Sequence, residues 1–414
     1  MRQSVGVDEI GRRNFIQLTG GIIAAGAFTG TVSGAPNNNW PQPRADAGRT
    51  ASTAASGPKD DVRTRWSAPG SDSGVIVGGC VYLSESGTVR ALRLTDGSER
   101  WSMQTDGSFA NLSATDETVY AAVGGEWNGI IALSTTDGTE RWRQELLQPQ
   151  HAPVIDDDLY VIVGNPESSD SDEFEGSLLA LSATDGTVQW EHSLDLDRER
   201  PSAPAVLNDT IYVAGSEVIA IDTDGEELWR NPDGGHHLTV ANGTVYVSIS
   251  PGLRALSASD GSEQWEYAVT IDGRPAEDAH ASAPAVVDGT VYFGLTDYQR
   301  EGAAGIYALS TTDGSEQWTT LFESDVVIGA PVVADGVLYS HAAGFADFPS
   351  ERGTVEGGRA FALDAADGSQ QWEIGDAEDT EFSDLIVTDG LVLVGKLSIR
   401  AGESEILALE EAAS

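Results

Sequence analysis

The sequence predicts an all-β protein, an eight-bladed β-propeller of four-stranded antiparallel blades. Three observations carry this prediction. First, a motif of ten or eleven residues that ends in tryptophan recurs along the chain. Second, a hairpin pattern precedes each copy of this motif. Third, a single strand pattern near the start of the chain can supply the strand that the last repeat lacks. The tryptophans are spaced 35 to 54 residues apart. Four-strand units at such a period are typical of propeller blades.

The repeated motif predicts the two outer strands of each blade. A short apolar strand precedes an Asp-Gly pair and a second strand follows it, and Asp and Gly tolerate the positive φ angles of tight hairpin turns. Upstream segments such as "APAVVDGTVYFG" from Ala283 predict the two inner strands. The copies of the motif are Ala91–Trp101, Ala132–Trp142, Ala180–Trp190, Ala220–Trp229, Ala255–Trp265, Ala308–Trp318 and Ala362–Trp372.

The two ends of the repeat region predict how the ring closes. Residues 384–411 supply three strands of a last blade, and Arg63–Trp66 reads as an outer strand without a blade. We expect Arg63–Trp66 to pair with Ile406–Glu410, which removes the exposed sheet edges. Each tryptophan is expected to cover the gap to the next blade and to bury about 200 Å², on the order of 5 kcal/mol gross. These structural residues are Trp66, Trp101, Trp142, Trp190, Trp229, Trp265, Trp318 and Trp372.

The region before the propeller predicts export. Arg12–Arg13, an apolar run and small residues near Ala35 have the order of a signal peptide and resemble the twin-arginine signal. We therefore expect a signal peptide at 1–34, a Pro-, Ala- and Ser-rich linker at 35–61 and the propeller at 62–414. Deleting residues 35–58 is expected to cost far less stability than deleting 35–67. The protein would be extracellular or at the cell surface, with an uncleaved signal anchor as the alternative.

Charge and cysteine content exclude several classes of function. Acidic residues number 66 against 23 basic ones, a formal net charge of −43. Such a chain repels nucleic acid and anionic lipid, and it is typical of exported proteins of halophilic microbes with acidic surfaces. We expect a monomer with no nucleic-acid partner and no membrane contact beyond the signal segment. Cys80 is the single cysteine, so neither an intramolecular disulfide nor a cysteine metal cluster can form.

Candidate binding residues concentrate on one face. The A–B and C–D turns are short, whereas the B–C and D–A loops at the other end of the blades are long, and rigid scaffolds carry binding sites on such loops. Basic residues just before the innermost strands would surround the channel mouth and bind a metal or an anion, or simply line a wet channel. They are His151, Arg200, His236, His237 and His280. Aromatic residues in the same loops would contact a partner or a sugar, or pack on neighbouring loops: Trp127, Tyr298, Phe345 and Phe348.

The Ala-x(5)-Gly-x(3)-Trp pattern resembles the tryptophan-docking motif of the quinoprotein-type eight-bladed propellers over about residues 62–414. That superfamily, the pyrroloquinoline-quinone (PQQ)-like repeat proteins, includes PQQ-dependent alcohol dehydrogenases, the propeller subunit of the outer-membrane protein assembly machine and many exported repeat proteins. The resemblance implies the same ring. In the quinoproteins, the channel mouth holds the cofactor.

Three functions follow from these patterns. The first is an exported, non-catalytic scaffold that binds another exported protein or a surface polymer through its B–C/D–A loop face. The second is a PQQ-dependent dehydrogenase, but the paired cysteines of those enzymes are absent, and nothing matches their calcium ligands or catalytic aspartate. The third is carbohydrate or polymer binding through the loop aromatics. We expect no catalytic residue, no metal site and no cofactor, with PQQ plus calcium as the alternative.

Overall fold

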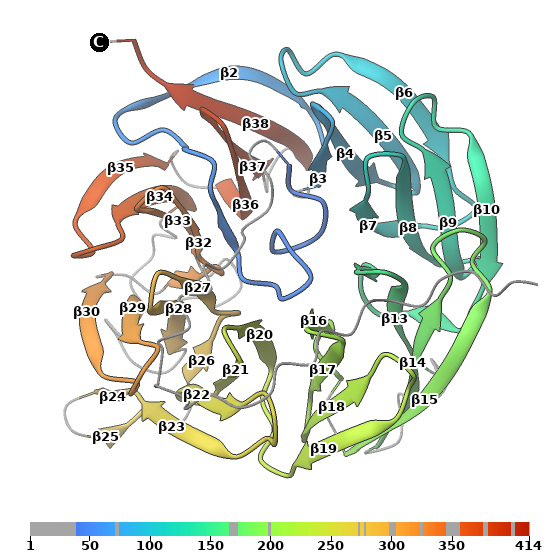
Figure 1. Ribbon diagram of the computed structural model, residues 1–414. Coiled ribbons are helices and arrows are strands. Elements are labelled where there is room, and N and C mark those ends of the chain that lie inside the picture. Colours follow the sequence, from blue (N-terminus) through green and yellow to red (C-terminus); the bar gives the residue numbers. More distant parts are fainter. Residues whose placement is uncertain are drawn as a thin grey trace, which may run out of the picture. The chain divides into compact units, whose positions relative to one another are not determined.

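In the computed structural model, every regular element of the described chain is a β-strand. The strands form eight four-stranded antiparallel blades around a central axis, so the predicted eight-bladed propeller is confirmed (Figure 1). Among the described residues, no helix has the length and apolar character that crossing a membrane requires. The described residues are 39–70, 74–164, 173–197, 200–271, 274–276, 279–297, 304–322, 326–344, 357–375, 380–398 and 402–413.

Within a blade the strands follow chain order from the axis outward, as strands A to D. Blades 1 and 2 are β3 (Val75–Val77), β4 (Cys80–Glu85), β5 (Thr88–Arg93) and β6 (Glu99–Gln104), then β7 (Phe109–Ala114), β8 (Thr118–Gly124), β9 (Gly129–Ser134) and β10 (Glu140–Glu145). Blades 3 and 4 are β11 (Gln148–Pro149) with β12 (Val154–Ile155), β13 (Leu159–Gly164), β14 (Glu173–Leu181) and β15 (Val188–Asp197), then β16 (Ala205–Leu207), β17 (Thr210–Ala214), β18 (Val218–Asp222) and β19 (Glu227–Asn231).

The second half of the ring repeats this order. Blades 5 and 6 are β20 (His237–Ala241), β21 (Thr244–Ile249), β22 (Gly252–Ser257) and β23 (Glu263–Ala268), then β26 (Ala279–Ala281) with β27 (Ala285–Val287), β28 (Thr290–Asp297), β29 (Gly305–Ser310) and β30 (Glu316–Leu321). A small ribbon, β24 (Thr270–Ile271) and β25 (Arg274–Pro275), lies between them in the chain. Blade 7 is β31 (Val326–Ile328) with β32 (Val332–Ala334), β33 (Val337–Gly344), β34 (Arg359–Asp364) and β35 (Gln370–Gly375).

Blade 8 closes the ring with strands from both ends of the described chain. β36 (Thr380–Thr388), β37 (Leu391–Ser398) and β38 (Glu403–Glu411) are completed by β2 (Val62–Pro69), which pairs antiparallel with β38. Trp66 lies opposite Ala408, and Arg63 forms an ion pair with Glu410 at 2.6 Å. The predicted closure by Arg63–Trp66 against Ile406–Glu410 is confirmed.

The tryptophans join each blade to the next through a hydrogen bond. Each indole lies on strand D, opposite an alanine of strand C, as Trp101 does with Ala91 and Trp66 with Ala408. Its Nε1 donates to a backbone carbonyl of the following blade or, for Trp372, of residue 58, at 2.7 to 3.2 Å. The pairs are Trp66–Leu94, Trp101–Thr135, Trp142–Ala183, Trp190–Thr223, Trp229–Ala258, Trp265–Thr311, Trp318–Ala365 and Trp372–Pro58.

The Asp-Gly turn of the following blade receives the indole. Gly138 has a φ of +73°, and a Cβ built there would lie 2.6 Å from a ring carbon of Trp101. Asp137 accepts hydrogen bonds from the backbone N–H and the hydroxyl of Thr139, which holds the turn. Glycine is therefore required at this position of the motif for two reasons: the positive φ angle of the turn and the space that the neighbouring indole occupies.

Residues 39–61, for which composition predicts a linker, follow the inside of the ring (Figure 1). We call residues 39–61 the inner segment. It meets the innermost strands in blade order, mostly by accepting a hydrogen bond from a strand N–H. The contacts are Trp40–Ile76, Pro41–Ala114, Gln42–Ile155, Ala47–Val206, Gly48–Val240, Thr50–Val286, Ala51–Val333 and Ser56–Gly390.

The inner segment is also part of the hydrophobic core. Trp40, Ala45 and Ala51 are almost fully buried, and β1 (Ser52–Thr53) pairs in parallel with β32. Pro58 then accepts hydrogen bonds from both Trp372 and Tyr339, in the place that an Asp-Gly turn fills at the other junctions. These contacts raise the stability cost that we expect for deleting residues 35–58.

We predict that Trp101→Ala lowers the free energy of unfolding by about 3–5 kcal/mol, because it removes a buried indole and leaves a cavity. Trp101→Phe keeps most of the ring but leaves the Thr135 carbonyl without its donor, at a cost of about 1–3 kcal/mol. Urea unfolding measures both. Trp127→Ala is the control, because Trp127 lies in the loop between β8 and β9, contacts Arg143 of its own blade and is outside the docking motif. A loss below about 1 kcal/mol for Trp101→Ala would contradict this role.

We also predict that a chain starting at residue 59 melts well below one starting at residue 35. It lacks the acceptors that the inner segment offers to the innermost strands, and the carbonyl that receives Trp372. A chain starting at residue 39 is the matched control and should melt like the longer one. Thermal unfolding measures all three. Equal melting temperatures for starts at 35 and 59 would show that the inner segment contributes nothing.

Candidate functional site

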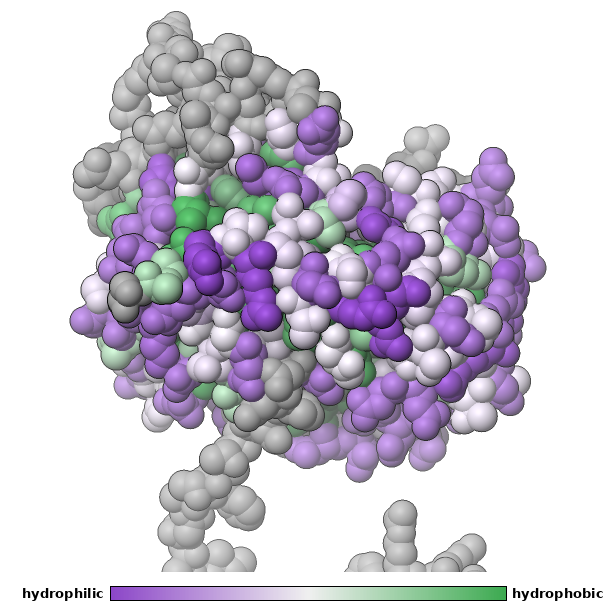
Figure 2. Space-filling model, turned by 90° about the horizontal axis from the view of Figure 1, so that it is seen from above, coloured by the Kyte–Doolittle hydropathy of each residue, from purple (hydrophilic) through white to green (hydrophobic). Residues whose placement is uncertain are grey.

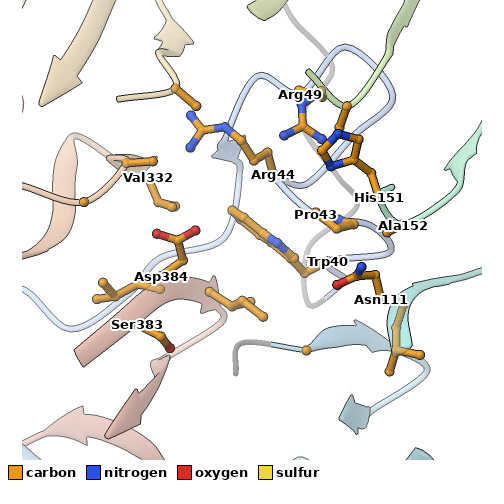
Figure 3. Close-up of a pocket in the computed structure, with 18 of the residues that line it drawn as sticks. Trp40, Pro43, Arg44, Arg49, Asn111, His151, Ala152, Val332, Ser383 and Asp384 are labelled. Atoms are coloured by element: carbon orange, nitrogen blue, oxygen red, sulfur yellow. The ribbon is translucent and has the colours of Figure 1, made fainter. Parts of the chain in front are cut away.

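A cavity of about 640 Å³ lies on the axis above the inner segment (Figure 3). The segment contributes Trp40, Pro43, Arg44 and Arg49 to its lining. The remaining lining comes mainly from the beginnings of innermost strands or from the residues just before them, such as His151 before β12 and Ser282 before β27. The inner segment binds the same strands near their other ends. It therefore forms the floor of the cavity, which opens toward the B–C/D–A loop face.

Two guanidinium groups on the floor face this cavity. Arg44 is held by the backbone: its Nη2 donates to the carbonyl of Pro284 at 2.6 Å and lies 3.4 Å from that of Pro331. Its Nε is buried without a hydrogen-bond partner. Within the described chain, Arg49 has neither a hydrogen bond nor an ion pair from its guanidinium. Burial lowers the pKa of Arg44 to about 9 and that of Arg49 to about 10, so both are cationic at neutral pH.

Two carboxylates are the nearest opposite charges. Asp46 accepts hydrogen bonds from the N–H and the hydroxyl of Thr50, and burial raises its pKa. Asp384 lies across the cavity from Arg49 (Figure 3), at a register shift in β36 between Phe382 and Leu385. Its carboxylate is exposed and lies 3.9 Å from Nδ1 of His341. Neither acid is within 4.0 Å of a guanidinium of the floor, so the two arginines remain unpaired among the described residues.

The structure brings the four predicted histidines to the same region, but only His151 and His237 line the cavity. His151 Nε2 lies 2.9 Å from the carbonyl of Pro201, a contact that fits a neutral ring donating through Nε2. Burial, aided by the charge of Arg49, lowers the pKa of both lining histidines to about 4. They are therefore neutral at pH 7. His236 and His280 lie beside each other instead, with ring centroids 6.0 Å apart.

The other predicted site residues lie apart from this cavity. Arg200 is exposed and close enough to His151 to lower its pKa slightly. Trp127 stacks under the guanidinium of Arg143, 5.3 Å from the ring centroid, which matches the alternative of packing onto neighbouring residues. Tyr298, Phe345 and Phe348 lie outside the described residues.

The lining does not fit a calcium ion of the kind that quinone-dependent dehydrogenases use. Calcium takes six to eight oxygen ligands, and among the described lining residues only Asp384 carries a carboxylate. The positive charges of Arg44 and Arg49 also oppose a bound cation. Over the described ranges, no group of three or more His, Cys, Asp or Glu side chains is arranged to hold a metal ion.

Sequence reasoning missed the floor of the cavity. Trp40, Arg44 and Arg49 lie in a stretch whose composition predicts a linker, and Asp384 looks like one more acid in an acidic chain. One signal was present in the sequence. Trp40 is a large aromatic residue in an otherwise polar stretch, outside the docking motif, and such a side chain needs a place to pack.

Comparison with known families gives one match over most of the chain. The family model described as outer membrane protein assembly factor BamB matches residues 85–231, 174–302 and 296–412. Among curated proteins, the serine/threonine-protein kinase AfsK of Streptomyces griseus is 31% identical over 187 residues, 42% of this chain and 20% of the kinase. AfsK of Streptomyces coelicolor is 29% identical over 182 residues, 42% of this chain and 19% of the kinase. The chain thus spans about a fifth of the length of these curated relatives.

Solved structures share the fold at low identity. BamB from Moraxella catarrhalis is 14% identical, with a TM-score of 0.59 over 84% of this chain and all of that one. The quinohemoprotein alcohol dehydrogenase from Comamonas testosteroni is 15% identical, with a TM-score of 0.65 over 91% of this chain and 81% of that one. Similarity at this level establishes the propeller and leaves its activity open.

We predict that His151 makes the protein less stable in acid. An unfolded histidine gains a proton near pH 6.5, whereas burial holds the pKa of His151 in the folded protein at about 4. The unfolded state therefore binds more protons between these values, and stability falls as the pH drops from 6.5 toward 4. Between pH 7 and 4.5, the wild type should lose about 2 kcal/mol more than His151→Gln, measured by urea unfolding. Parallel pH profiles would contradict the buried neutral ring.

Proposed function

Because the chain belongs to the family of the outer membrane protein assembly factor BamB, we propose that it is a non-catalytic binding scaffold. Its partner would be another exported protein or a surface polymer, held on the B–C/D–A loop face. The twin-arginine pattern around Arg12–Arg13 supports export, and the acidic composition supports a place outside the cell in a high-salt setting.

The observation that carries this proposal is the difference between the two faces of the ring. The described A–B and C–D turns are tight, and Asn208, Asn242 and Asp288 adopt the positive φ angles of such turns. Large exposed hydrophobic residues lie at both ends of the blades: Leu147, Leu321 and Leu397 toward the B–C/D–A loops, and Val188 and Leu228 at the starts of β15 and β19, beside the C–D turns. Hydrophilic residues dominate the face of the molecule that Figure 2 shows. The proposal therefore depends on the longer B–C/D–A connections, such as the one between β33 and β34, because rigid scaffolds carry binding sites on such loops.

Two other functions have less support. The cavity lining does not fit calcium, and this weakens the case for a PQQ-dependent dehydrogenase. Oxidation of an alcohol in the presence of PQQ, calcium and an artificial electron acceptor would nevertheless contradict the scaffold proposal and support the dehydrogenase. Binding of carbohydrate or another polymer would use the same loop face. If the loop face binds carbohydrate, we expect a bound species that glycosidases degrade and proteases do not.

We predict that a photo-crosslinking amino acid at position 147 or 321 captures one partner of defined mass in intact cells. The same group at Thr184, an exposed residue of a C–D turn on the other face, is the matched control and should capture none. Gel mobility and mass spectrometry measure the products. Equal capture from both faces, or none from the loop face, would contradict a scaffold that works through its loops.

An Arg12→Lys/Arg13→Lys variant tests export in the same cells. We expect this variant to stay inside the cell and to lose the crosslinked species, because twin-arginine signals require both arginines. Normal secretion of the variant would remove the twin-arginine interpretation, and the crosslinking result would still decide the scaffold proposal separately.

A further inference from the structure

We propose that the axial cavity binds a small oxyanion, a carboxylate or phosphate group, through the guanidinium groups of Arg44 and Arg49. This proposal concerns the cavity rather than the outer loops, and it does not depend on the scaffold function. It assigns a ligand to two residues of the inner segment, which precedes the blades in the chain.

The first support is the unmet hydrogen-bonding capacity of the two arginines. A buried charge is normally paired with an opposite charge or fully hydrogen-bonded. Arg44 has donors directed at the carbonyls of Pro284 and Pro331, but its buried Nε has no partner. Among the described residues, the Arg49 guanidinium has no acceptor. A guanidinium fork presents donors in a plane that matches carboxylate and phosphate oxygens, so an oxyanion fits the missing partner.

The second support is the charge balance of the lining. Arg44 and Arg49 carry two positive charges, and Asp384 is the single carboxylate among the described lining residues. His151 and His237 are neutral at pH 7, because burial lowers the pKa of each to about 4. The lining thus has a net positive charge inside a chain whose formal net charge is −43. Protein surrounds the cavity, so salt screens this charge less than it screens charges on the outer surface.

The third support is the arrangement of polar groups around the arginines. Arg49 lies beside His151, and Asn111 projects from β7 on the same side as Trp40 and Pro43 (Figure 3). The hydroxyls of Ser282 and Ser383 also belong to the lining. The Asn111 amide and the Ser383 hydroxyl can donate to the outer oxygens of a hydrophilic ligand, while the backbone holds Arg44 in position. The volume of about 640 Å³ admits a metabolite-sized molecule.

The experiment is calorimetric titration of the full chain with citrate and with inorganic phosphate, at an ionic strength kept constant with potassium chloride. We expect saturable binding of at least one of them, weakened at least tenfold by Arg49→Gln. Arg254→Gln is the matched control, because Arg254 lies on β22 and pairs with Glu266 at 2.8 Å, away from the cavity. It should leave the affinity unchanged. The tighter of the two probes identifies the ligand group as carboxylate or phosphate.

Two results would overturn the proposal. One is the absence of saturable binding for both probes, and the other is an equal effect of Arg49→Gln and Arg254→Gln. If Arg49→Gln does not fold, the wild type supplies the test through its ¹⁵N-labelled arginines. We then expect two Nε–Hε signals to shift with saturation as citrate or phosphate is added. A titration in which no arginine signal shifts for either probe overturns the proposal as well.

Discussion

The hydrogen bond from each indole to the neighbouring blade is the interaction on which the rest of the structure depends. A four-stranded blade has two faces to bury and cannot do so alone, so its stability comes from its neighbours. The indole joins two blades at once, since its ring lies over the next Asp-Gly turn while its Nε1 binds a carbonyl there. The alanine opposite each tryptophan leaves room for the ring. The seven copies of the motif therefore supply the Asp-Gly turns of seven junctions, and Pro58 completes the eighth.

The last junction explains why the chain before the blades is needed. Blade 8 ends with β38, so it has no Asp-Gly turn after its third strand to receive the indole of Trp372. Pro58 supplies the missing carbonyl, and β2 follows directly as the fourth strand of that blade. The pairing of Val62 with Glu411 spans nearly the whole chain, so closure must wait until the C-terminal strands exist. An export route for folded proteins, which we propose, is compatible with such late closure.

The sequence was sufficient to predict the blades, but it did not predict which residues line the central cavity. Repeats predicted the blades, the turns and the pairing of Trp66 with the last strand, because local spacing and turn chemistry determine these features. The inner segment has no periodicity, and its contacts join residues far apart in the chain, such as Ala51 and Val333. Because each histidine comes just before an innermost strand, the sequence predicted that the histidines lie near the channel mouth. It did not predict which of their rings face the axis. His236 and His237 are neighbours in the chain, yet only His237 lines the cavity, as expected where successive side chains alternate in direction.

Using arginine rather than lysine on the floor of the channel has a physical consequence. A guanidinium keeps its proton even when burial lowers its pKa, so the pKa values of about 9 and 10 still leave both groups charged at neutral pH. The pKa of a buried lysine, whose ordinary value is lower, falls further toward neutrality. The neighbouring histidines show the same cost of burial and lose their charge. The chain can therefore have an acidic composition and still hold two positively charged side chains at its centre. That charge lies on the inner segment, whose contacts with successive blades fix the distance between Arg44 and Arg49.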